Sequence, residues 1–144
     1  MRRAARAATF AAVAASFIAA VASAALATGR TLTFTATVTS VNVVVGPTST
    51  ETFTQKLTAH GRSAGSAALD CTNTATNQTC NVTYTLKGAF RHGAITATVN
   101  FPRSRTGKGN VTGGSGAYAG ANGTITVKHA DNVNRRYTVT IKLR

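Results

Sequence analysis

The stretch TLTFTATVTSV, from Thr31 to Val41, alternates between apolar residues and threonine. This period of two, together with the β-branched residues, predicts a half-buried β-strand. The apolar face of its first part consists of Leu32, Phe34, Ala36 and Val38. The next apolar set has the opposite parity and consists of Val41, Val43 and Val45. A β-bulge near Ser40 would place both sets on the same face.

The same alternation recurs from there to the C-terminus, without a convincing helical period. Turn signals divide this part of the chain into about eight short strands. Such strands can stack as a sandwich or close as a barrel. The last strand runs to Arg144 and needs a partner, which the long first strand can supply. We therefore predict an all-β fold, an eight-stranded antiparallel up-and-down barrel.

The N-terminus predicts an exported protein. Three arginines among the first six residues precede an alanine-rich apolar run, and Ala25-Leu26-Ala27 is a small-x-small cleavage site. This pattern is that of a secretory signal peptide, residues 1–27, because the run is short for a membrane anchor. Cleavage leaves a single secreted domain, residues 28–144. We favour the general export route over the twin-arginine route, and the alanine-rich leader indicates a bacterial protein.

The chain is strongly basic, with 16 lysines and arginines against three acidic residues and a formal charge of +13. Without the three leader arginines, residues 28–144 carry a charge of +10. Such a charge favours anionic partners, among them cell-wall polymers, lipid headgroups and nucleic acid. The cations are scattered singly or in pairs, and no nucleic-acid recognition motif accompanies them.

Cys71 and Cys80 are the two cysteines, in the segment CTNTATNQTC. In an exported chain such a pair predicts a disulfide, and the eight intervening residues suit two adjacent antiparallel strands. A metal site would need further ligands, and this segment contains no histidine.

The stretch VTGGSGAYAGANG, Val111 to Gly123, contains five glycines. It lacks the lysine of a P-loop, the third glycine of a dinucleotide-binding loop and the last glycine of a nucleophile elbow. The glycines are therefore expected to serve the backbone, through a tight turn around Ala117-Tyr118 and close approach of neighbouring strands. We expect positive φ at two or more of Gly113, Gly114, Gly116, Gly120 and Gly123.

This glycine stretch resembles the GGSG…Y…G-A-x-G signature of the allene oxide cyclase and dirigent proteins. The segment FTQKL, Phe53 to Leu57, is similar to the F-S-N-K-L of the cyclases, and LKGAFRHGAITATVNF and RYTVTIKL match two further parts of the family pattern. The resemblance implies an eight-stranded antiparallel barrel, often trimeric, whose apolar cavity binds a small hydrophobic molecule.

The resemblance also fixes which face of each strand is inward. The ligand-cavity residues predicted in this way are Phe34, Val38, Phe53, Gln55, Leu57, Tyr84, Leu86, Ile95, Val99, Tyr137, Val139 and Ile141.

The acids of the family are missing from their expected places. Gln55 stands where the cyclases have asparagine, Thr54 and Gln55 stand where dirigent proteins have acids, and residues 30–45 contain no acid. General acid–base catalysis then has no agent, so the sequence favours binding over catalysis and assigns no catalytic residue.

Other polar residues are expected to be structural. The histidines fall at or near predicted turns, where exposure is the default: His60, His92 and His129. His129 and Asp131 lack a third metal ligand, so no metal or cofactor site is predicted. Tyr118 is expected to pack over the glycine turn.

Three classes of function stay open on the sequence. The first is a secreted barrel that binds a small hydrophobic molecule. The second is a cationic, threonine-rich module that binds anionic cell-wall polymers. The third is an isomerase of the cyclase type.

We predict that Cys71 and Cys80 are bonded in the exported protein. Mass spectrometry of non-reduced, alkylated protein should detect no free thiol, and two alkylated cysteines would contradict the disulfide. Reduction should lower the free energy of unfolding by about 2.5–3 kcal/mol, the value for a loop of this size.

Overall fold

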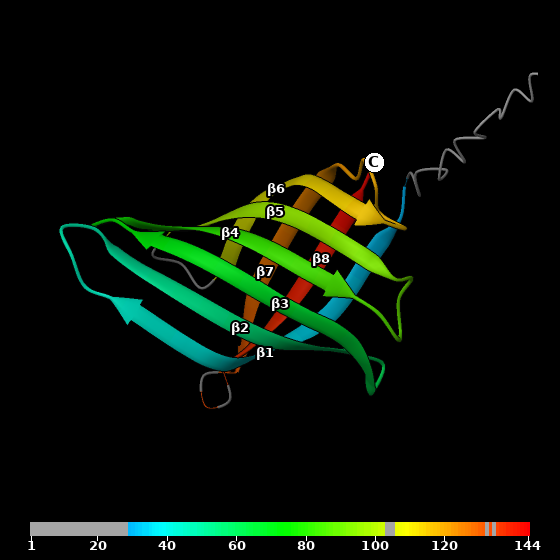
Figure 1. Cartoon of the computed structure of the whole chain (residues 1–144), viewed down its shortest axis with the longest axis horizontal. Coiled ribbons are helices and arrows are strands. Elements are labelled where there is room, and N and C mark those ends of the chain that lie inside the picture. Colours follow the sequence, from blue (N-terminus) through cyan, green and yellow to red (C-terminus); the bar gives the residue numbers. More distant parts are fainter. Residues whose placement is uncertain (1–28, 103–105, 132, 134) are drawn as a thin grey trace, which may run out of the picture.

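The computed structural model describes residues 29–102, 106–131, 133 and 135–144, so the predicted signal peptide lies outside the described residues. Eight antiparallel strands close into one barrel in sequence order, as predicted (Figure 1). Within the described ranges no helix is long and apolar enough to cross a membrane. The strands are β1 (Thr31–Val44), β2 (Ser49–Ala59), β3 (Arg62–Asn73), β4 (Asn77–Leu86), β5 (Gly93–Pro102), β6 (Thr106–Gly116), β7 (Gly123–Asp131) and β8 (Arg136–Leu143).

Closure of the barrel depends on the pairing of the first strand with the last. Residues 31–37 of β1 pair with residues 142–136 of β8 without interruption. Every strand then has two hydrogen-bonded neighbours over its central part, which removes the free edges that an open sheet would present. The alternation in β1 follows from this arrangement, because Leu32, Phe34 and Ala36 point into the barrel and the threonines between them point outward.

One end of the barrel is closed by packed side chains. Phe90, in the loop between β4 and β5, lies against Phe34 with the ring centroids 5.9 Å apart. Phe34 in turn meets the edge of Tyr84, with a centroid distance of 5.2 Å. The large side chains that are at most 1% exposed in this interior include Leu32, Leu57, Leu86, Ile95, Val139 and Ile141.

At the other end, β1 and β2 extend past the point where β1 leaves β8 (Figure 1). The predicted bulge is present, since the β1–β2 register shifts between Val38 and Ser40. It restores the inward parity, but it does not bury the second apolar set. Val41, Val43 and Val45 are 36%, 50% and 87% exposed, because no strand continues beside them once the pairing with β8 has ended.

The glycine stretch forms more strand than the sequence suggested. Residues 111–116 belong to β6, and the turn is confined to residues 117–120. Gly116, Gly120 and Gly123 have φ of 61°, 72° and 146°. Positive φ therefore occurs at three of the five glycines, and Tyr118 packs over the turn with 3% of its surface exposed.

The disulfide joins two residues that lie directly opposite each other on β3 and β4. The Cα atoms of Cys71 and Cys80 are 4.0 Å apart, and both side chains are buried on the inner wall of the barrel. The turn beyond them is closed by the Thr74 hydroxyl, which accepts a hydrogen bond from the Asn77 amide at 3.1 Å. A disulfide of this kind is compatible with an extracellular protein.

Replacement of Gly123 by alanine should lower the free energy of unfolding by at least about 1–2 kcal/mol, because φ there is positive and a Cβ would collide with the carbonyl oxygen of Lys142. Gly113→Ala is the matched control, since its Cβ would meet only the hydroxyl of Thr96, at 3.3 Å. Denaturant unfolding of both variants measures the difference. Equal stability of the two variants would contradict the role given to Gly123.

Candidate functional site

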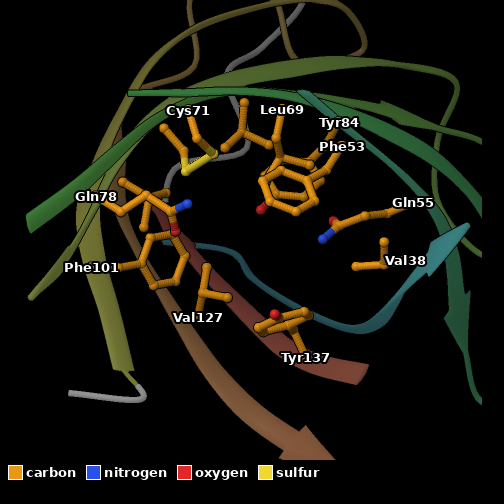
Figure 2. Close-up of a pocket in the computed structure, with 13 residues that line it drawn as sticks. Val38, Phe53, Gln55, Leu69, Cys71, Gln78, Tyr84, Phe101, Val127 and Tyr137 are labelled. Atoms are coloured by element: carbon orange, nitrogen blue, oxygen red, sulfur yellow. A yellow bond between two sulfur atoms is a disulfide. The ribbon is translucent and has the colours of Figure 1, made fainter. Parts of the chain in front are cut away.

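A cavity of about 70 Å³ lies inside the barrel, on the side of the β1–β2 and β3–β4 hairpins. Its walls are mainly aliphatic and aromatic, with two glutamine amides and two tyrosines among them (Figure 2). The lining residues are Val38, Phe53, Gln55, Leu69, Cys71, Gln78, Cys80, Val82, Tyr84, Val99, Phe101, Val127 and Tyr137.

The cavity contains half of the residues that the sequence predicted for it. These are Val38, Phe53, Gln55, Tyr84, Val99 and Tyr137. The other half face the barrel interior but pack at its closed end instead of lining the cavity: Phe34, Leu57, Leu86, Ile95, Val139 and Ile141. Strand parity predicts whether a side chain faces the inside or the outside of the barrel. The position of that side chain along the barrel axis depends on the stagger of the strands, which parity does not predict.

Several lining residues were missed, although the period of two could have found them. Gln78 stands two residues before Cys80, and Phe101 stands two residues after Val99, so each lies on an inward face. Val127 lies opposite Val139 on β7 and β8. The strand register places these three side chains in the cavity wall. Gln78 and Phe101 lie close to turn signals, so the sequence did not define where their strands end.

Gln55 provides a polar group deep in the cavity. It is 7% exposed, and its side chain makes no hydrogen bond with another described residue. Its amide points into the cavity from β2 (Figure 2). The amide atoms are accessible from the cavity, so a polar group of a bound molecule could form a hydrogen bond with them.

Tyr84 provides a second polar group in the same wall. It is 1% exposed, and burial raises the pKa of its hydroxyl well above the usual value of 10.0. Within the part of the chain that the structure describes, no hydrogen bond satisfies this hydroxyl. At neutral pH it is therefore a neutral donor and acceptor, and it cannot act as a base.

A carboxylate faces the rim of the cavity. Glu51 on β2 lies opposite Cys71 on β3, and paired residues of an antiparallel ladder point to the same face. The Gln78 side chain donates a hydrogen bond from Nε2 to Glu51 Oε2 at 3.1 Å. The sequence analysis considered residues 30–45 and the places of Thr54 and Gln55, and it gave Glu51 no role at the cavity. Counting back in twos from Gln55 leads to Glu51.

Two aromatic side chains form the opposite side of the rim. His129 lies against Tyr137 with a centroid distance of 4.9 Å and an interplanar angle of 78°. Burial raises the pKa of Tyr137, the positive charge of Arg135 lowers it in part, and the negative charge of Glu51 raises it. His129 is half-buried on β7 and borders an open cleft that continues from the cavity, so the expectation of an exposed turn histidine holds for His60 and His92 but not for His129.

The chemistry of this site is that of recognition. Hydrogen bonds can come from two amides and two phenols, a negative charge from Glu51, and apolar contact from the remaining walls. Among the described residues no three histidine, cysteine, aspartate or glutamate side chains come together in a way that could hold a metal ion.

Comparison with known proteins gives a fold and no family by sequence. No family model and no curated protein sequence matches the chain. Among solved structures the barrel is similar to pyocyanin demethylase, with a TM-score of 0.66 and 21% identity over 80% of this chain and 100% of that chain. It is also similar to a pterocarpan synthase dirigent protein, with a TM-score of 0.63 and 16% identity over 79% of this chain and 84% of that one. The fold is dirigent-like.

Replacement of Tyr84 by phenylalanine should change the free energy of unfolding at pH 7 by less than about 0.5 kcal/mol, because the hydroxyl makes no hydrogen bond with any described residue that the change would break. The folded-state pKa of Tyr84 lies above its unfolded value of 10.0, so its contribution is complete below pH 10 and is lost as the pH rises further. The variant should therefore lose less stability than the wild type between pH 9 and pH 11.

Denaturant unfolding at both pH values measures these two effects. A large loss of stability at pH 7 would show that the hydroxyl is held by a partner in the folded protein. An alkaline loss equal to that of the wild type would show that folding does not raise the pKa of Tyr84.

Proposed function

We propose that the protein is an exported barrel that binds a small, largely aromatic molecule in the cavity at its open end. The observation that carries this proposal is the side chain of Gln55, which is 7% exposed, points into the cavity and has no hydrogen-bond partner among the described residues. Its amide atoms are accessible from the cavity and therefore open to a hydrogen bond with a bound molecule. Together with Tyr84 it gives the cavity two polar groups that would fix the orientation of a ligand.

The walls supply the affinity. Phe53, Phe101, Tyr84 and Tyr137 surround the cavity, and their rings suit edge or stacked contacts with a flat molecule. Burial of apolar surface contributes about 25 cal/mol per Å², so most of the binding free energy would come from these rings and from the aliphatic residues between them. The cleft beside Tyr137 and Phe101 extends the site toward solvent and gives a ligand a way in.

The structural neighbours support a small-molecule ligand. Pyocyanin demethylase and the pterocarpan synthase dirigent protein are both named for small organic molecules, and both have this barrel. A module that bound cell-wall polymers through its cationic, threonine-rich exterior would not need an unpartnered amide inside the barrel. The cavity therefore favours the first of the three functional classes that the sequence left open.

The neutral aromatic alcohol benzyl alcohol is a suitable probe, because the cavity of about 70 Å³ and the cleft beside it suit one ring at most, and isothermal titration calorimetry can measure its binding. Gln55→Leu should weaken binding about fivefold, the value of one neutral hydrogen bond. Val127→Phe should weaken it at least about tenfold, because the larger ring fills the space from the cavity wall.

Thr126→Phe is the matched control, since Thr126 precedes Val127 on β7 and points outward. This control should bind as the wild type does. Absence of binding to the wild type, or equal weakening by the Val127 and Thr126 variants, would refute a ligand site in this cavity.

A further inference from the structure

We propose that Glu51 makes the site selective for organic cations, so that its ligand is an aromatic molecule that carries a protonated amine or another cationic nitrogen. This inference rests on the proposed function and adds the charge of the ligand to it.

The first argument is the position of Glu51. It lies opposite Cys71 of β3 and Val43 of β1, so it shares their inward face, and it is half-buried. The chain has only three acidic residues, and Glu51 is joined to the cavity wall by its hydrogen bond with the lining residue Gln78. Asp70 is exposed on the outside of β3, and Asp131 lies at the end of β7, where it accepts a hydrogen bond from the backbone of Val133.

The second argument is the state of the carboxylate. Its one hydrogen bond to a described side chain comes from the neutral amide of Gln78, which lines the cavity. In the described ranges no lysine or arginine forms a salt bridge with Glu51, although the chain has 16 cationic residues. A half-buried carboxylate that is hydrogen-bonded but not neutralised retains its negative charge for a bound cation.

The third argument is the surroundings of this charge. Gln78 joins Glu51 to the cavity wall by a hydrogen bond. Two opposite charges act on the Tyr137 hydroxyl: Arg135 lowers its pKa and, to a smaller extent, Glu51 raises it, so the carboxylate has to act against a neighbouring guanidinium. The rings of Tyr137, Phe101 and Phe53 present π faces and edges in the same space (Figure 2). Aromatic walls with one carboxylate are the usual means of binding an organic cation, through cation–π contact and a charge-assisted hydrogen bond.

The fourth argument is that Gln55 gives the site a second, independent sign of a ligand. Its amide lies deeper in the cavity on the same strand, four residues from Glu51 and thus on the same inward face. A molecule whose ring fills the cavity near Gln55 can place its cationic group at the rim beside Glu51. The basic exterior would favour anions, so a preference for cations would have to come from this one carboxylate and not from the overall charge.

The test compares three probes that share one ring system and differ in charge at pH 7. They are benzylamine, which is cationic, benzyl alcohol, which is neutral, and benzoate, which is anionic. Calorimetric titration of the full-length mature protein should show the order cation, alcohol, anion, with about tenfold or more between the first and the last.

The variant Glu51→Gln keeps the shape and the hydrogen-bonding groups and removes the charge. It should weaken binding of the amine about tenfold, change binding of the alcohol by no more than about twofold and strengthen binding of the benzoate. Asp70→Asn is the matched control, because it removes the same charge from the outer face one residue away from Cys71. This control should leave all three affinities unchanged.

The two proposals fail in different ways. If the wild type binds the three probes equally, or if Glu51→Gln and Asp70→Asn have the same effect, the selection of cations by Glu51 is overturned while the ligand cavity stands. If the wild type binds none of the three probes, the proposed function is overturned and the inference about Glu51 with it. Thermal unfolding of both variants should match the wild type, which shows that the comparison is made on folded protein.

Discussion

The pairing of β1 with β8 is the constraint on which the rest of the structure depends. It runs through residues 31–37 and 142–136, and it closes the sheet so that every inward side chain has an interior to face. The same pairing also ends early, because β1 continues to Val44 after β8 has begun at Arg136. The barrel is therefore filled at one end and open at the other. The register of β1 against β8 thus determines both the closure of the barrel and the end at which the cavity lies.

The open end is held in shape by local bonds that do not depend on closure. The disulfide between Cys71 and Cys80 ties β3 to β4 on the inner wall, directly beside the position of Glu51 on β2. Gln78, two residues before Cys80 on β4, reaches across β3 to that carboxylate. The covalent bond thus fixes the strand that carries one amide of the cavity, and the amide fixes the carboxylate at the rim. Polar groups in such a position are oriented before any ligand arrives, which lowers the entropy that binding would cost.

Charge is distributed unevenly between the two faces of the barrel. The described lysines are exposed on the outer face among rows of threonine, whereas the inner face carries aromatic rings, amides and the single carboxylate of Glu51. A strongly basic protein can therefore present a negative group to a small molecule inside it. Salt screens the outer charges beyond about 8–10 Å, while the carboxylate of Glu51 acts at contact distance in a partly dehydrated site. The outer surface can therefore favour anions while the cavity favours cations.

The sequence by itself determined the class of fold, the number of strands, the bulge near Ser40, the pairing of the two cysteines and the backbone role of the glycine stretch. Each of these follows from local chemistry: a period of two, a parity change, a pair of thiols or a residue without a Cβ. Only the tertiary structure decided which inward residues line the cavity and which fill the closed end, why Val43 and Val45 are exposed, and that Glu51 and His129 belong to the rim. The reason is that parity gives the face of a side chain, while its height and neighbours depend on the stagger between strands and on the place where β1 leaves β8.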